Sequence, residues 1–180
     1  MFRLTRNLSA IALLTIALLG APDARAAGCP HAHAAAADAS RGDVTHATVC
    51  LINAVRRRHG LSTLRLNGQL SSAARGHSSD MVRRRYFAHY TPEGLSPAHR
   101  VRSTGYLSGH RQWIVGETLS WWRGQATPAA VVVGWMHSPP HREVLLHPAF
   151  RDVGIGVVLG TPLPAGRAGA TYTADFGVRF

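Results

Sequence analysis

Two histidines and one glutamate are the side chains of this sequence best suited to chemistry. His89 ends the sequence YFAH, Glu117 is the centre of GET, and His141 follows two prolines in WMHSPPHR. Imidazole and carboxylate groups can bind a divalent cation or transfer protons. Because the three residues lie far apart in the sequence, only the fold can bring them together.

The WMHSPPHR stretch does not fit the known patterns that it resembles on first reading. His137 and His141 are four residues apart, like the two ligands of a helical zinc protease, but that pattern needs an unbroken helix and a glutamate after the first histidine. Prolines at 139 and 140 break the helix, and residue 138 is serine. Ser138 also lacks the Gly-x-Ser-x-Gly context of a hydrolase nucleophile. We therefore expect His137 at the surface and His141 in the site.

Apolar periodicity, capping residues and prolines predict the elements that position these side chains. Helices are expected at residues 48–58, 68–84, 97–105, 129–137 and 141–146, a strand at 114–119, and a hairpin of 153–159 with 171–178. Helices precede a short terminal sheet, so the sequence predicts an α+β fold. His77 falls on the apolar face of the second helix, where we expect a buried histidine held by a hydrogen bond.

The first 26 residues have the composition of a secretion signal. Arg3 and Arg6 precede an apolar run at 8–19, and the segment ends in a small-x-small pattern at 24–26. We expect cleavage after Ala26; the alternative is an uncleaved anchor. The apolar run is shorter than the roughly 20 residues of a membrane span, and we expect no transmembrane segment in the mature chain. The protein is predicted to be secreted, extracellular or held at the cell envelope.

The rest of the chain is basic and has two cysteines. The net charge is +11, and loss of three arginines and one aspartate with residues 1–26 leaves +9. Such a surface favours anionic envelope polymers, and an exported protein is not expected to meet nucleic acid. In an oxidising compartment Cys29 and Cys50 are expected to form a disulfide. It would staple an Ala/His-rich segment, residues 27–46, to a domain at 47–180; a reactive thiol is the weaker alternative.

Five motifs in order resemble the bacterial branch of the CAP superfamily. They are YFAH at 86–89, GET at 116–118, WxxSxxHR at 135–142, VGIGV at 153–157 and YxxDFG at 172–177. This superfamily, also called the SCP domain, holds the cysteine-rich secretory proteins, antigen 5 and the plant pathogenesis-related proteins of class 1. The resemblance covers about residues 50–180. It implies an α-β-α sandwich with a small central antiparallel sheet, and a cavity lined by two histidines and two acidic residues.

Carried over residue by residue, the resemblance places His89, Glu117 and His141 at three of the four cavity positions. Ser138 stands at the fourth, where animal members have glutamate, and Thr118 stands where asparagine is usual. Two imidazoles and a carboxylate with an open position would suit a divalent cation, zinc above others. The alternative is that the three side chains only hold the cavity together by hydrogen bonds.

Three functions remain open from the sequence. The first is a non-enzymatic binding module whose ligand, a cation, a small molecule or a lipid, is held by His89, Glu117, Ser138 and His141. The second is a metal-dependent hydrolase in which His89, Glu117 and His141 are catalytic. The third is an envelope-adhesion protein acting through its arginine-rich surface. We favour the binding module over an enzyme; the sequence gives no indication of the ligand or the oligomeric state.

Overall fold

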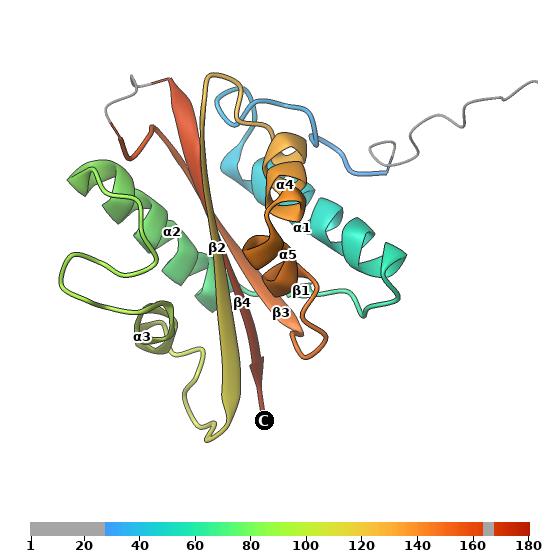
Figure 1. Cartoon of the computed structure of the whole chain (residues 1–180), viewed down its shortest axis with the longest axis vertical. Helices are drawn as coiled ribbons and strands as arrows, with labels where there is room; N and C mark the ends of the chain where they lie inside the picture. Colours follow the sequence, from blue (N-terminus) through green and yellow to red (C-terminus); the bar gives the residue numbers. More distant parts are fainter. Residues whose placement is uncertain (1–27, 164–167) are drawn as a thin grey trace, which may run out of the picture.

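The 180-residue chain is described by a computed structural model over residues 28–163 and 168–180. The predicted signal segment, residues 1–26, lies outside the described residues. The elements, in chain order, are α1 (Arg41–Arg58), β1 (Arg65–Leu66), α2 (Gly68–Arg84), α3 (Pro97–Ser103), β2 (Trp113–Arg123), α4 (Pro128–His137), α5 (Pro139–Leu145), β3 (Asp152–Leu159) and β4 (Gly169–Arg179) (Figure 1).

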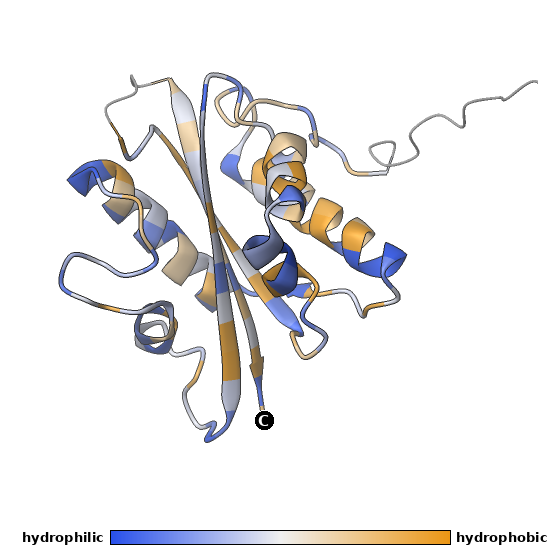
Figure 2. Ribbon diagram, in the orientation of Figure 1, coloured by the Kyte–Doolittle hydropathy of each residue, from blue (hydrophilic) through white to orange (hydrophobic). Residues whose placement is uncertain are grey.

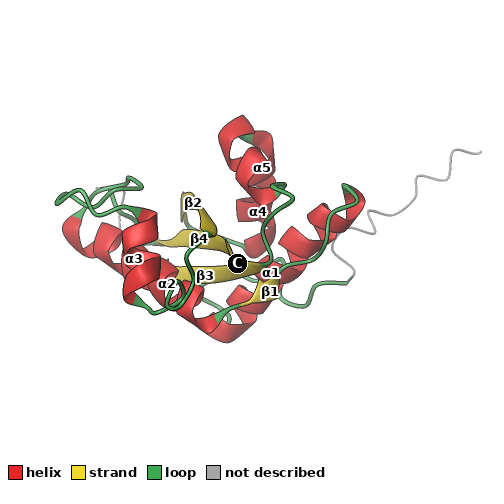
Figure 3. Cartoon of the chain, turned by 90° about the horizontal axis from the view of Figure 1, so that it is seen from below, coloured by secondary structure: helices red, strands yellow, loops and turns green. Residues whose placement is uncertain are grey.

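A four-stranded sheet forms the middle layer, in the order β1-β3-β4-β2. Strands β3 and β2 both pair antiparallel with β4, and the two-residue β1 pairs parallel with β3. Helices α2 and α3 lie on one side of the sheet, and α1, α4 and α5 lie on the other (Figures 1 and 3). The predicted α-β-α sandwich is confirmed. Its sheet is mixed rather than wholly antiparallel because of β1, which is too short to show a sequence pattern.

Two glycines of β3 let α2 pack directly against the sheet. A Cβ atom built on Gly154 would lie 2.1 Å from the backbone of Leu70, and one on Gly156 would lie 2.2 Å from the backbone of Ala74. Only glycine permits so close an approach of a helix to a strand. Ser78 of α2 adds a hydrogen bond from its hydroxyl to the Gly156 carbonyl, at 3.2 Å.

The main hydrophobic core fills the space between the sheet and helices α1, α4 and α5. All three helices contribute buried apolar residues to this layer, and the ribbons of α1 and α4 are largely apolar (Figure 2). Its largest fully buried side chains are those of Ile52, Trp135, Leu145, Tyr172 and Phe176. Burying each such side chain contributes about 1.5–3 kcal/mol, so this layer supplies much of the stability.

Two helices begin earlier than the sequence predicts. Helix α1 starts at Arg41 instead of residue 48, because Ser40 is its N-cap and accepts a hydrogen bond from the Asp43 amide at 3.1 Å. Helix α5 starts at Pro139 instead of residue 141. A proline tolerates the first turn of a helix, where its missing N–H has no intrahelical partner. The prolines therefore end one helix, as predicted, and also begin the next.

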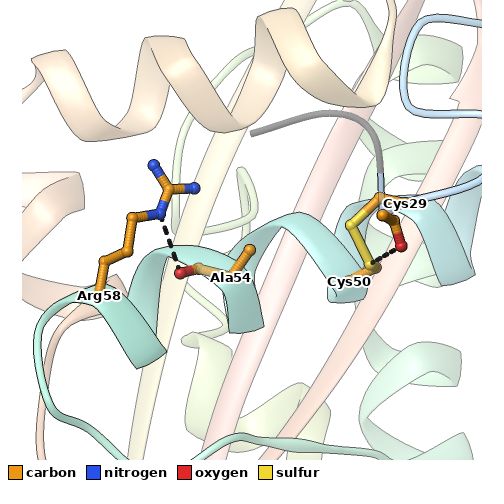
Figure 4. The surroundings of a disulfide bond; sticks show 5 residues. Cys29, Cys50, Ala54 and Arg58 are labelled. Atoms are coloured by element: carbon orange, nitrogen blue, oxygen red, sulfur yellow. Dashed lines mark hydrogen bonds between the residues drawn. A yellow bond between two sulfur atoms is a disulfide. The ribbon is translucent and has the colours of Figure 1, made fainter. Parts of the chain in front are cut away.

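The predicted disulfide joins Cys29 to Cys50 of α1, with 5.7 Å between their Cα atoms (Figure 4). It fixes the segment before α1 to the middle of that helix. Further along the same helix, the Nε of Arg58 donates to the Ala54 carbonyl at 3.2 Å. Within residues 28–163 and 168–180, no helix has the length and apolar character needed to cross a bilayer.

Candidate functional site

Glu117 is the centre of a buried charge network on β2. Its side chain is only 2% exposed, and both of its carboxylate oxygens have partners. The Nδ1 atom of His89 lies 2.7 Å from Oε1, and Arg100 donates from a terminal nitrogen to Oε2 at 2.5 Å. The structure therefore brings together two of the predicted site residues, His89 and Glu117. Charge-assisted bonds of this kind are shorter and stronger than neutral ones.

Arg100 of α3 belongs to this network and was not predicted from the sequence. Its other terminal nitrogen donates to the carbonyls of His89, at 2.9 Å, and Leu95, at 3.0 Å. The guanidinium thus fixes the loop that carries His89 and neutralises Glu117 at the same time. The sequence shows two arginines on this short helix, Arg100 and Arg102, and it does not indicate which one faces the sheet.

His141 lies in the first turn of α5 and is half-buried. Desolvation lowers its pKa, and the nearby charge of His89 lowers it further. Among the described residues, no hydrogen bond or ion pair joins His141 to His89 or Glu117. Ser138 is the N-cap position of α5, but its side chain makes no capping hydrogen bond. The ligand-binding roles of His89, Glu117, Ser138 and His141 stay predictions.

Asp175 is a second carboxyl group behind the site. It is the β4 residue directly opposite Glu117 in the sheet register, and it is fully buried. Neither of its carboxylate oxygens has a hydrogen-bond partner among the described residues. Burial raises its pKa well above the usual range, and the charge of Glu117 raises it further. Asp175 is thus a carboxyl group whose ionised form is disfavoured by burial and by the neighbouring Glu117. In the sequence, Asp175 appeared as the aspartate of the YxxDFG motif at 172–177, without an indication that it lies beside Glu117.

The donor atoms do not fit a zinc ion held by His89, Glu117 and His141. Among the described residues, no group of three or more His, Cys, Asp or Glu side chains is arranged to hold a metal ion. Both oxygens of Glu117 are bonded, and Arg100 already supplies the positive charge. A cation bound to a carboxylate oxygen of Glu117 would have to share that oxygen with His89 or Arg100. The predicted zinc and the hydrolase that depends on it therefore stay predictions without support from this arrangement.

A groove of about 300 Å³ lies elsewhere, between α1 and α4. Apolar side chains of the two helices form its walls: Leu51, Val55, Ala129, Val132, Val133 and Met136. Basic and imidazole groups also line it, namely His33, Arg58, His59 and His137. His137 is exposed, as predicted, and its Nδ1 lies 2.8 Å from the Val133 carbonyl. No sequence pattern indicated this groove, because most of its residues lie on two helices far apart in the chain.

The fold, with Glu117 of β2 paired to His89 of the loop after α2, defines an SCP-type α-β-α sandwich. The chain matches the model of the cysteine-rich secretory protein family, CAP, over residues 49–173. It is 38% identical over 126 residues to the uncharacterized protein YkwD of Bacillus subtilis, a match that covers 70% of this chain and 44% of YkwD. The chain therefore belongs to the CAP family, and it spans less than half the length of this relative.

Solved structures agree with this family. An extracellular protein of Bacillus anthracis that contains an SCP domain is 25% identical, with a TM-score of 0.59; the match covers 77% of this chain and 43% of that one. An outer surface protein of Borrelia burgdorferi has a TM-score of 0.60 at 20% identity, covering 73% of this chain and 90% of that one. The second likeness shows the fold alone.

Proposed function

We propose that this protein is an exported binding module that holds the hydrocarbon chain of an anionic lipid between α1 and α4. The observation that carries the proposal is the groove itself, which combines apolar walls with cationic and titratable groups. A pocket of about 300 Å³ lies at the lower end of the size range of small-molecule sites. The proposal places the ligand away from Glu117, whose oxygens are already bonded.

The walls of the groove account for the chain of the lipid. The six wall residues named above are all apolar, and Val133 is 54% exposed. The hydrocarbon chain of the lipid would therefore cover apolar surface that now faces water. Each buried methylene contributes about 0.8 kcal/mol. Ten methylenes would contribute about 8 kcal/mol before the costs of association, which corresponds to micromolar or weaker binding.

The charged lining residues account for an anionic headgroup. Arg58 uses its Nε within its own helix, bonding Ala54, and forms no salt bridge with another described residue. Its terminal nitrogens are therefore available to a carboxylate or phosphate, with which an arginine forms strong paired bonds. His59 and His137 lie along the same groove and would add positive charge when protonated.

Structural neighbours and the charge support an action at the cell envelope. The two structural neighbours are an extracellular protein and an outer surface protein. An exported chain with this excess of arginine would meet anionic lipids and polymers at the envelope, where its charge favours association.

A fluorescence titration with cis-parinaric acid, an 18-carbon fatty acid, tests the proposal. The unmodified protein should bind the probe in the micromolar range. Val133→Trp places an indole in the groove at an exposed helix position and should weaken binding at least tenfold. Leu66→Trp is the control, because Leu66 is a 40% exposed apolar residue on β1, outside the groove. His89→Ala should leave binding unchanged.

Two outcomes would reject the proposal. If Val133→Trp and Leu66→Trp bind the probe equally well, the groove is not where the chain lies. If His89→Ala abolishes binding while Val133→Trp retains it, the ligand site is the His89–Glu117 pair instead.

Arg58→Gln tests the headgroup separately from the hydrocarbon chain. This variant should weaken binding of the fatty acid and leave binding of the corresponding alcohol unchanged.

A further inference from the structure

Strand β2 forms one edge of the sheet and has no neighbouring strand on its outer side. The strand order ends with β2, which pairs only with β4. Figure 3 shows it as the outermost strand, with α3 on one side and α4 and α5 on the other. An edge strand presents a row of backbone groups to which another extended chain can bond.

The register identifies which backbone groups point outward. The Phe180 amide donates to the Gln112 carbonyl at 3.0 Å, and the Gly124 amide donates to the Ala168 carbonyl at 3.2 Å, at the two ends of the β2–β4 pairing. In an antiparallel pair the bonding direction alternates along the strand. Even-numbered residues of β2 therefore bond to β4, and odd-numbered residues direct their N–H and C=O groups away from it.

Three residues offer open backbone groups: Trp113, Val115 and Glu117. No described residue forms a hydrogen bond with the outward N–H or C=O groups of these three. The next outward carbonyl, that of Leu119, already accepts from the Trp135 indole at 3.0 Å. The open part of the edge thus runs from Trp113 to Glu117, and the Trp135 indole closes it at Leu119. Its bonding residues repeat every two positions, about 6.8 Å apart, as those of an added strand would.

The surroundings of this part of the edge are basic. On β2 and the segment from 86 to 112 the only acidic residues are Glu93 and Glu117, and each is paired with an arginine. Basic side chains lie beside β2: the His89 side chain is 47% exposed, and the Arg102 guanidinium lies over the Trp113 ring at 5.7 Å. An acidic partner would meet complementary charge along the edge.

We propose that the β2 edge over Trp113–Glu117 binds an acidic peptide segment by strand addition. The peptide lies extended beside β2, bonds to the three outward residues, and directs carboxylate side chains toward His89 and Arg102. Backbone bonds supply affinity, and the flanking cations select acidic sequences, as in other cases of strand addition. This surface is separate from the lipid groove of α1 and α4.

A fluorescein-labelled heptapeptide of alternating glutamate and valine serves as the probe. Fluorescence anisotropy should show saturable binding, and a lysine-for-glutamate peptide should bind at least tenfold more weakly. A second glutamate–valine peptide carries N-methyl groups on every second amide, those that would face β2. It keeps its charge but loses these hydrogen-bond donors, and it should also bind about tenfold more weakly. Val115→Pro removes one outward N–H without touching a β2–β4 bond, and it should weaken binding similarly.

Amide hydrogen exchange gives a readout that does not depend on a variant. The amides of Trp113, Val115 and Glu117 should exchange quickly in the free protein and slow at least tenfold when peptide is bound, whereas those of Ile114 and Gly116 should be protected throughout. Equal binding of the N-methylated peptide would overturn strand addition and leave only charge attraction. The proposal would also be overturned if the amides of Trp113, Val115 and Glu117 became protected as the protein concentration rises without peptide, because a second copy of the protein would then occupy the edge.

Discussion

Arg100 is expected to be the most important single charge for the stability of the site. Its side chain is 11% exposed, and that of its partner Glu117 is 2% exposed. Arg100→Leu would leave a carboxylate buried without its cation and would release the two carbonyls that the guanidinium binds. Breaking a buried ion pair by removing one partner costs about 3–5 kcal/mol.

Urea unfolding followed by circular dichroism measures this loss. With a urea dependence of about 1–3 kcal/mol per molar, a loss of 3 kcal/mol lowers the midpoint by about 1 M or more. Arg102→Leu is the matched control on the same helix. Arg102 stacks over Trp113 at the surface, a contact worth about 0.5–1 kcal/mol.

A double variant tests the reasoning more closely. Arg100→Leu combined with Glu117→Gln removes both charges, so it should be more stable than Arg100→Leu alone, although it carries one more substitution. Equal midpoints for Arg100→Leu and Arg102→Leu would refute the claim that a buried ion pair holds this site. The claim would also be refuted if the double variant lost as much stability as Arg100→Leu and Glu117→Gln lose separately when added together.

Three further predictions concern the frame around the site. Replacing Cys29 and Cys50 by serine should cost about 3 kcal/mol, and the unmodified protein in reductant should show the same unfolding midpoint as this variant. Gly154→Ala should lower the free energy of unfolding in urea by more than about 3 kcal/mol, because the backbone of α2 occupies the place of the new Cβ. Gly76→Ala is the contrast: this glycine lies inside α2 with open space around it, so alanine should stabilise the protein by about 0.5–1 kcal/mol. Burial lowers the pKa of His77, so the unfolded state binds the proton first and stability should fall as the pH decreases below about 6.5; His77→Gln should make this fall shallower.

The sequence predicted the frame of the molecule well because its signals are local. Asn67 caps α2 through its side chain, and Pro128 begins α4 after the Thr127 cap, as the pattern indicated. His77 is buried with its Nε2 2.9 Å from the Ala88 carbonyl, also as predicted. Capping residues, prolines and apolar spacing act within a few positions of the element they define. The elements that they set were therefore predictable, apart from the starts of α1 and α5.

The site was predictable only in part, because its remaining members depend on long-range packing. His89 and Glu117 follow from short motifs, and the structure pairs them. Arg100 enters because α3 turns one of its two arginines toward the sheet, and Asp175 enters because the register of β4 places it opposite Glu117. The α1–α4 groove arises in the same way from two distant helices. None of these relations has a spacing that can be read along the chain.

Methyl NMR spectra of the protein with and without palmitate test the central claim most directly. The account predicts that the shifts are confined to the methyl groups that line the groove, those of Leu51, Val55, Val132, Val133 and Met136, and that Val115 and Leu95, on the His89–Glu117 side, stay unchanged. Unchanged groove methyls at saturating palmitate would contradict it, and so would shifts centred on Val115 and Leu95.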